Sequence, residues 1–362
     1  MGGRAQDVAL FSRRHISFDP VIFTKTGLTF FCWVVYLEFI FCSSLDGTIL
    51  VMAKYTQLGP HEIRLLAQRY KLEITDYSVI EGGAANSSFF LNANGNEYVL
   101  TIADDKSVEN VFILVGLLDY LTENGFPTSR VVVSGGGEKI TLFRGKAVIV
   151  KEYIPGVTKR NISKDGLFSL GLILARLHQI PAPDFIPQTH SYGVELFPNA
   201  VGLNFDAEFE DSLTQMGDHF KGEIPRGLPR GLIHADVFWD NVICLNGEFR
   251  ALIDFEDACN YFKVYDLASA LFGSCVEGGK LNLDKAAQII KGYEQVRVLE
   301  VDERRALQIL TVYAGVAISF WRYMKYNLYN PTEENKNLHK QTAAIADRIH
   351  AIPADIFSQV FI

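Results

Sequence analysis

The sequence predicts an α+β protein of two lobes, a β-rich N-terminal lobe followed by a larger, mainly helical C-terminal lobe. Three observations lead to this prediction. Short β-like segments separated by turn residues fill the chain up to about residue 150, and helical periodicity prevails after Gly156. The length of 362 residues is too great for one compact core and suits two lobes.

The first 51 residues differ in character from the rest and are left out of the fold prediction. An apolar run from Phe30 to Cys42 is interrupted only by Glu38 and falls short of the ~20 residues that span a bilayer. Basic residues precede it, as in a signal peptide, but no small-residue cleavage site follows cleanly. A membrane anchor, a targeting segment and translated sequence upstream of the true start all stay open. We favour the last, because ordinary globular patterning begins at Met52.

Residues 52–150 are expected to form the N-terminal lobe. Pro60 suits the first turn of a helix, and Gly125 is expected to end a second, amphipathic helix. Asn94-Gly95 predicts a tight hairpin turn between two strands. The expected helices are 60–70 and 107–124, and the expected strands are 77–81, 87–92, 97–102, 131–134, 139–143 and 147–153.

Residues 151–362 are expected to form the C-terminal lobe, joined to the first by a hinge near 150–156. A strongly apolar helix is predicted over 168–179, followed by a proline-rich loop over 181–187. From about Val264 to His350 the periodicity is mostly helical. We therefore expect this lobe to contribute helices around a few short strands.

Composition excludes several classes of function. With 48% hydrophobic and 21% charged residues the chain is typical of globular proteins, and a net charge of -8 offers no basic footprint for nucleic acid. Five cysteines without a CxxC pair argue against zinc sites and disulfide frameworks, and indicate free thiols in a reducing compartment. We expect a cytoplasmic protein that does not associate with membranes, and the sequence gives no indication of its oligomeric state.

The stretch from Gly231 to Leu267 carries the chemistry. It contains His234-x-Asp236-x-x-x-x-Asn241, and Asp254 follows an apolar strand. Phosphoryl transfer needs one carboxylate to accept the proton of the attacking hydroxyl. It also needs hard oxygen donors to hold Mg²⁺ on the phosphates. Asp236 as base, with Asn241 and Asp254 as metal ligands, fills these roles.

A structural interpretation competes with the functional one. A single Asp or Asn is usually a cap or turn residue, but here each carboxylate lies beside an apolar strand, where an unpaired charge is costly. We therefore favour the functional interpretation for the combination. His234 belongs to the catalytic candidates, although bracing of the loop by hydrogen bonds is its expected role. Asp266 is expected to cap a helix or brace a loop.

Several segments resemble the aminoglycoside phosphotransferase and choline kinase superfamily, and within it the homoserine kinases of the type found in pseudomonads. The similar segments are 97–102, 118–127, 174–178, 230–236, 240–242, 252–255, 258–260 and 265–268. The resemblance implies a protein-kinase-like fold with an N-terminal antiparallel sheet lobe. It also implies ATP-dependent phosphorylation of a small-molecule hydroxyl. L-Homoserine is the expected acceptor and O-phospho-L-homoserine, on the route to threonine, the expected product.

The resemblance also implies roles for individual residues. Asp236 is the expected base, and Asn241 and Asp254 are the expected Mg²⁺ ligands. A loop from Gly82 to Ser88 is expected to cover the ATP phosphates, and the backbone near residue 150 to meet adenine. The residues expected to bind the nucleotide are Gly82, Gly83, Asn86, Ser87, Ser88, Val150, Glu152 and Tyr153. Glu109 matches the acidic position of the helix that follows the third strand, and a solvated surface Glu is the alternative.

Two departures from the family pattern keep alternatives open. Thr101 stands where the superfamily often carries a phosphate-binding lysine, so Lys106 and Lys151 become candidates for that charge. The loop reads Ala85-Asn86-Ser87-Ser88 where the family has acidic-Asn-Thr-Asn. The acceptor could therefore be another amino alcohol or a choline-like or aminoglycoside-like molecule. A pseudokinase that binds nucleotide or a partner without turnover is the alternative from another class.

Overall fold

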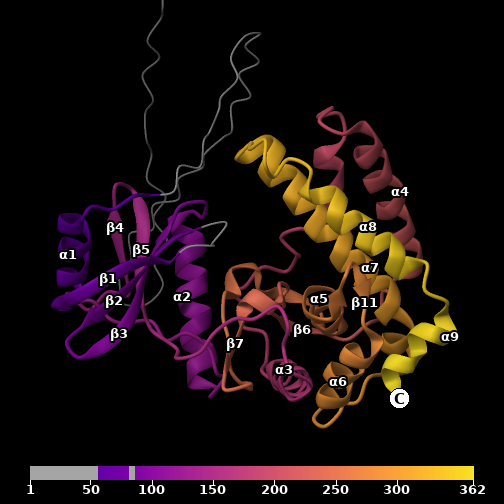
Figure 1. The fold of residues 1–362 in the computed structure, drawn as a ribbon, viewed down its shortest axis with the longest axis horizontal. Coiled ribbons are helices and arrows are strands. Elements are labelled where there is room, and N and C mark those ends of the chain that lie inside the picture. The colour runs from indigo at the N-terminus through magenta and orange to yellow at the C-terminus, as the bar shows by residue number, and fades with distance from the viewer. Residues whose placement is uncertain (1–55, 81–85) are drawn as a thin grey trace, which may run out of the picture. The chain divides into compact units, whose positions relative to one another are not determined.

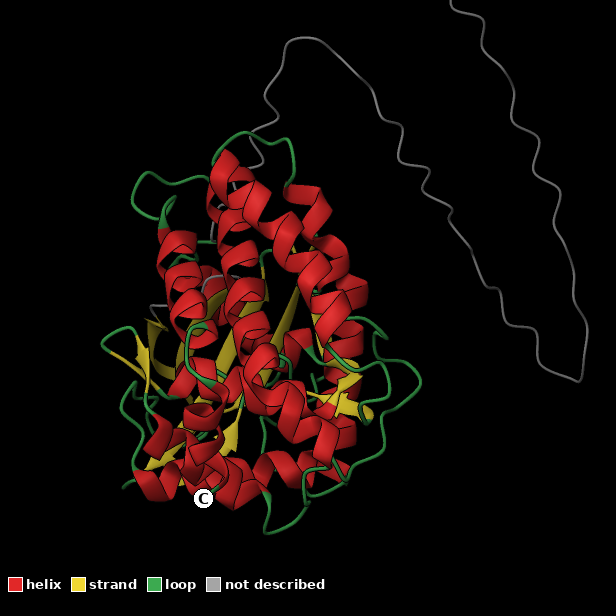
Figure 2. Cartoon of the chain, turned by 90° about the vertical axis from the view of Figure 1, so that its right-hand side faces the viewer, coloured by secondary structure: helices red, strands yellow, loops and turns green. Residues whose placement is uncertain are grey.

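The computed structural model describes residues 56–80 and 86–362, all within one compact unit. The expectations for residues 1–51, Met52, Gly82 and Gly83 lie outside these described residues. The predicted α+β, protein-kinase-like fold is confirmed, because an N-terminal antiparallel sheet is followed by a mainly helical C-terminal part (Figure 1). Figure 2 shows how strongly helix prevails in that part.

The N-terminal sheet has five antiparallel strands in the order β1-β2-β3-β5-β4. Asn94 and Gly95 both adopt a positive φ, 51° and 75°, as the predicted hairpin turn requires. The bounds are β1 (Ile74–Ile80), β2 (Asn86–Ala93), β3 (Asn96–Ala103), β4 (Ile140–Phe143) and β5 (Lys146–Glu152).

The predicted strand at 131–134 is wrong, because the segment forms only a single bridge, between Val131 and Lys151. The Val132 amide donates to the Val150 carbonyl, and at Ser134 the chain already folds into a turn closed by the Glu138 carbonyl. The turn residues that follow therefore stop the pairing before a strand can develop.

Two helices cover opposite faces of this sheet (Figure 1). Helix α1 (Pro60–Arg69) packs its buried residues on the face that carries Leu100 and Val150. Helix α2 (Val108–Glu123) packs on the other face, beside Ala147 and Ile149, and begins where the Ser107 hydroxyl accepts a hydrogen bond from an amide of the first turn. Because side chains alternate along a strand, this arrangement assigns each sheet residue to an α1 face or an α2 face.

Among the described residues, the C-terminal part is built from seven α-helices and three short antiparallel strand pairs, two of which are hairpins of consecutive strands. The helices are α3 (Lys164–Leu177), α4 (Ala207–Glu223), α5 (Lys263–Ser274), α6 (Leu283–Tyr293), α7 (Val301–Tyr323), α8 (Leu338–His350) and α9 (Ala354–Phe357). The paired strands are β6 (Arg230–Ile233) with β9 (Cys259–Phe262), β7 (Val242–Leu245) with β8 (Glu248–Leu252), and β10 (Val276–Glu277) with β11 (Lys280–Leu281). Helix α4 was not predicted.

Glycines allow α3 and α6 to approach closely. A Cβ added at Gly171 would lie 1.9 Å from the Ile289 carbonyl oxygen, and one at Gly292 would lie 1.9 Å from that of Phe168. This pair of helices therefore anchors the core beneath α5, which carries part of the site described below. Over 56–80 and 86–362, none of the helices is both long and apolar enough to cross a bilayer.

Candidate active site

The backbone of residues 234–237 is held by side chains of α5. The buried Asp266 carboxylate accepts hydrogen bonds from the His234 and Ala235 amides, both at 2.8 Å. The Ser269 hydroxyl accepts another from the Val237 amide at 3.0 Å. A rigid helix thus fixes the loop that carries Asp236, and Asp266 braces this loop from inside α5 rather than capping the helix.

The His234 ring makes its hydrogen bonds to the backbone that frames the loop. Its Nδ1 accepts from the Asp236 amide at 3.2 Å, so its Nε2 carries the proton that bonds the Ile253 carbonyl at 2.8 Å. Burial lowers the pKa of His234, which keeps the ring neutral and suits this single tautomer. These contacts join the Asp236 loop to the strand that ends before Asp254, and they assign His234 a positioning role.

Asp236 and Asn241 are joined by two hydrogen bonds. The Asn241 amide nitrogen donates to the backbone carbonyl and to Oδ2 of Asp236, each at 2.9 Å. The Ile253 amide in turn donates to the Asn241 carbonyl at 3.0 Å, which places Asp254 one residue away. The structure therefore brings together Asp236, Asn241 and Asp254, the three residues that the sequence singled out.

Two positions of this site have left-handed backbone. The φ of Ala235 is 72° and that of Asp254 is 68°, a region that residues with a Cβ seldom adopt. Each lies at a sharp turn directly after a strand, β6 in one case and β8 in the other.

Acidic side chains crowd the site. Burial, followed by the charges of Asp257, Asp254 and Asp240, raises the pKa of Asp236 well above its usual range. Burial likewise raises the pKa of Asp254, although the Lys151 ammonium opposes that rise. Burial and the Asp254 charge raise the pKa of Glu256 to about 7. A cluster of carboxylates that destabilise one another in this way is suited to a cationic ligand.

The donor set fits a magnesium ion bound with phosphates. The Asn241 amide nitrogen is committed to Asp236, so its oxygen is the available donor atom, and Asp254 supplies a carboxylate. Amide and carboxylate oxygens are the hard ligands that Mg²⁺ prefers. No three His, Cys, Asp or Glu side chains converge as a metal site among residues 56–80 and 86–362. Phosphate oxygens and water would therefore have to complete the coordination.

The α2 face of the sheet carries part of the expected nucleotide-binding set. The Ser88 hydroxyl lies 3.3 Å from that of Thr101, and the ring of Tyr153 packs edge-on against Phe90 with centroids 5.1 Å apart. At the start of β2, the Asn86 amide nitrogen donates to a Glu256 carboxylate oxygen at 2.5 Å. The Asn86 Oδ1 is buried and has no hydrogen-bond partner among the described residues.

Three of the other expected nucleotide-binding residues lie elsewhere. Ser87 is on the α1 face, where its hydroxyl donates to Asp104 at 2.5 Å, because alternation along β2 turns it away from Ser88. Val150 also faces α1, and its carbonyl accepts from Val132. The Glu152 amide donates to the Arg130 carbonyl, and the Glu152 side chain is exposed.

The first open backbone groups after β5 are the Tyr153 carbonyl and the Ile154 amide. Neither makes a hydrogen bond within the described part of the chain, whereas the Tyr153 amide donates to the Glu97 carbonyl. Adenine contacts are therefore expected at the last residue of the range predicted from sequence, Tyr153, and one residue beyond it, at Ile154. Glu109 is exposed in the first turn of α2, which fits its surface alternative.

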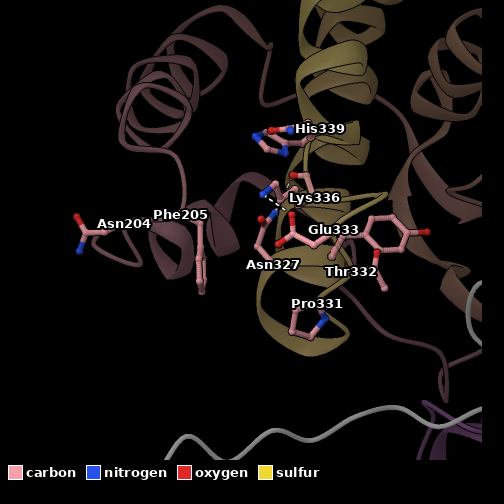
Figure 3. A pocket seen from close by; sticks show the side chains of 10 residues that line it. Asn204, Phe205, Asn327, Pro331, Thr332, Glu333, Lys336 and His339 are labelled. Carbon is pink, nitrogen blue, oxygen red and sulfur yellow. Dashed lines mark hydrogen bonds and ion pairs between the residues drawn. The ribbon is translucent and has the colours of Figure 1, made fainter.

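One cavity lies beside these groups, and a larger one lies apart from them. One of about 240 Å³ lies beside the acidic cluster, between α2 and the turn after Asp254, and is lined by Lys106, Ser191, Glu256 and Asp257 among others. A larger one of about 500 Å³ lies at residues 326–339 and contains none of the expected site residues. Its walls carry Asn327, Lys336 and His339 (Figure 3).

Sequence reasoning missed an aromatic side chain near Asp236 and an arginine near Asp240. Burial and then the charges of Asp257 and Asp236 raise the pKa of Tyr192 well above its usual range, which places its ring near the carboxylates. Trp321 contacts this ring at a centroid distance of 6.1 Å. Beside it, burial lowers the pKa of Arg322, and the Arg160 charge lowers it further. No spacing in the sequence links these distant positions.

The chain is similar to known phosphotransferases over most of its length. Residues 76–299 match the phosphotransferase enzyme family (APH). A homoserine kinase of Phenylobacterium zucineum is 32% identical over 281 residues, 75% of this chain and 86% of that protein. One of Sinorhizobium medicae is 30% identical over 286 residues, 76% of this chain and 87% of that protein.

Solved structures share the fold at low identity. An amicoumacin kinase in complex with AMP-PNP, Ca²⁺ and Ami has a TM-score of 0.64 at 17% identity, covering 81% of this chain and 94% of that one. A microcompartment-associated aminopropanol kinase has a TM-score of 0.62 at 16% identity, covering 80% and 96%.

Proposed function

Because the chain belongs to the phosphotransferase enzyme family, we propose that it transfers the γ-phosphoryl group of ATP to the hydroxyl of L-homoserine. The observation that carries the choice of acceptor is the similarity to homoserine kinases over most of the length of both proteins. The product is O-phospho-L-homoserine, and the proposed setting is threonine biosynthesis in the cytoplasm.

Asp236 is the proposed base. Its carboxylate accepts the proton of the acceptor hydroxyl while the hydroxyl oxygen forms a bond to the γ-phosphorus and the bond to the ADP oxygen breaks. Asn241 and Asp254 are the proposed ligands of Mg²⁺, which neutralises phosphate charge when bound. Asp266 and His234 hold the loop so that the base needs no rearrangement. Positioning of this kind accounts for much of the catalysis in phosphoryl transfer.

The cations beside the loop favour an acceptor that carries a carboxylate. Arg322, at the end of α7, lies near enough to Arg160 for their charges to oppose each other, and Asp240 is the acidic group close to both. Neither arginine forms an ion pair within the described ranges. An amino acid satisfies this arrangement, with its carboxylate at the arginines and its ammonium at Asp240. Choline has no carboxylate to offer.

A panel of acceptors tests this function. The purified protein is given MgATP with L-homoserine, choline, 1-amino-2-propanol or an aminoglycoside, and ADP release is followed together with mass spectrometry of the product. We expect kcat/KM for homoserine to exceed that of every other acceptor by about 10-fold or more. Preference for another acceptor would make the protein a different kinase of this fold. ATP binding without turnover on any acceptor would support the pseudokinase alternative.

A further inference from the structure

The third strand carries no cation for the ATP phosphates. Strand β3 reads NEYVLTIA, without a lysine or arginine. Thr101 is 4% exposed and directs its hydroxyl at Ser88. Protein kinases place a lysine on the third strand to neutralise phosphate charge, and the superfamily that this chain resembles often does the same. A protein with the function proposed above therefore needs this charge from another element.

Lys151 lies on the neighbouring strand, on the same α2 face as Thr101. In the pairing of β3 with β5, Thr101 is opposite Ile149, and Val99 is opposite Lys151. Lys151 is thus the diagonal neighbour of Thr101, a separation of roughly 7–8 Å that long side chains can bridge. The half-buried lysine can extend its ammonium into the space in front of the threonine.

The charge of Lys151 also reaches the metal-binding end of the site. It is the strongest of the charges that hold down the pKa of Asp254, and it acts in the same direction on Glu256. Lys151 makes no ion pair with any residue of 56–80 or 86–362. Its ammonium therefore lies close to carboxylates without being bound by one.

The other lysines near the site are engaged. The Lys106 ammonium pairs with Asp257 at 3.2 Å. The Lys146 ammonium pairs with Asp104 at 2.6 Å and also contacts the Thr56 hydroxyl at 3.1 Å. Either would have to give up a partly or fully buried carboxylate before it could bind phosphate, at a considerable cost.

We propose that Lys151 on β5 is the phosphate-binding cation of this protein, in place of the third-strand lysine. The inference rests on the proposed ATP-dependent function but not on the identity of the acceptor. Lys151 would contact the polyphosphate and leave adenine to the backbone beyond β5.

Calorimetric titration of full-length variants with MgATP, MgADP and adenosine tests the proposal. Lys151→Met should weaken binding of MgATP and MgADP by about 10- to 100-fold, the loss expected for a charge-assisted hydrogen bond. Adenosine affinity should change less than about twofold, since adenosine has no phosphate. Lys151→Arg should retain part of the affinity for MgATP and MgADP that Lys151→Met loses. Lys291 is an exposed lysine of α6, so Lys291→Met should bind all three ligands as the wild type does.

A charge swap gives an independent readout. Thr101→Lys combined with Lys151→Met returns a cation to the third strand and should recover part of the lost MgATP affinity. Thermal melting identifies a variant that fails to fold. If Lys151→Met fails to fold, the role of Lys151 is tested by comparing the MgATP affinity of Lys151→Arg with that of the wild type. Equal loss of ATP and adenosine binding, or no loss of either, would overturn the role of Lys151. A wild-type protein that binds no MgATP would overturn the proposed function itself.

Discussion

Removal of the Asp266 carboxylate should cost both stability and activity. Asp266 is fully buried and accepts from two backbone amides at 2.8 Å and from the His178 ring at 3.2 Å. In Asp266→Ala, the His234 and Ala235 amides lose their partner at about 1–3 kcal/mol each. We therefore expect the free energy of unfolding to fall by about 2–6 kcal/mol, a large part of the ~5–15 kcal/mol typical of folded proteins.

The conservative variant separates charge from shape. Asp266→Asn keeps the volume and one acceptor oxygen, but its amide group faces an N–H donor, so we expect about half of that loss. Because a displacement of ~1 Å near the reacting groups can cost ~100-fold, kcat should fall by about that factor in Asp266→Ala.

Denaturant unfolding and steady-state kinetics measure the two effects. Asp165→Ala is a matched control, since Asp165 is an exposed acid in the first turn of α3. The reasoning is refuted if Asp266→Ala loses less than ~1 kcal/mol and keeps the kcat of the wild type.

Four further predictions concern the chemistry. Asp236→Asn should lower kcat by ~10²–10⁴-fold with little change in ATP affinity; a loss of ATP binding alone would make Asp236 a nucleotide or metal ligand. Asp254→Ala should abolish Mg²⁺-dependent turnover while circular dichroism shows an intact fold, and near-normal rates at low Mg²⁺ would contradict its role. Arg322→Gln should raise KM for homoserine about 10-fold or more and leave KM for ATP unchanged. Asp257→Asn removes a charge that raises the pKa of Asp236, so the acidic limb of the kcat/KM profile should move to lower pH; an unmoved limb means another group titrates.

Local signals in the sequence predicted most of the N-terminal lobe. Pro60, the Asn94-Gly95 pair and Gly125 each impose a backbone conformation by themselves, so the elements they bound appear where expected. The segment 131–134 has strand-forming residues, but its pairing depends on where the following turn lies. That is a tertiary property, and the local pattern does not contain it.

The candidate site likewise contains residues that the sequence predicted and residues that only the structure reveals. Asp236, Asn241 and Asp254 are close in sequence, so their spacing and the apolar strands beside them could bring them into one hypothesis. Asp266 serves the same loop from within a helix, and only the fold reveals how many donors it accepts. The displacement of Ser87 to the opposite sheet face follows from the register of β2, which a one-residue shift would have reversed.

The left-handed backbone at Ala235 and Asp254 limits how far this protein can be stabilised without loss of activity. Strained positions of this kind cost roughly 1–3 kcal/mol each and persist where function rewards them. Glycine would adopt the conformation at 235 without a Cβ clash, so that position offers a route to a sturdier fold. Position 254 offers no such route if its carboxylate is needed, because glycine would remove the proposed Mg²⁺ ligand together with the backbone strain. Thermostability and catalytic competence are therefore in opposition at one of these turns and compatible at the other.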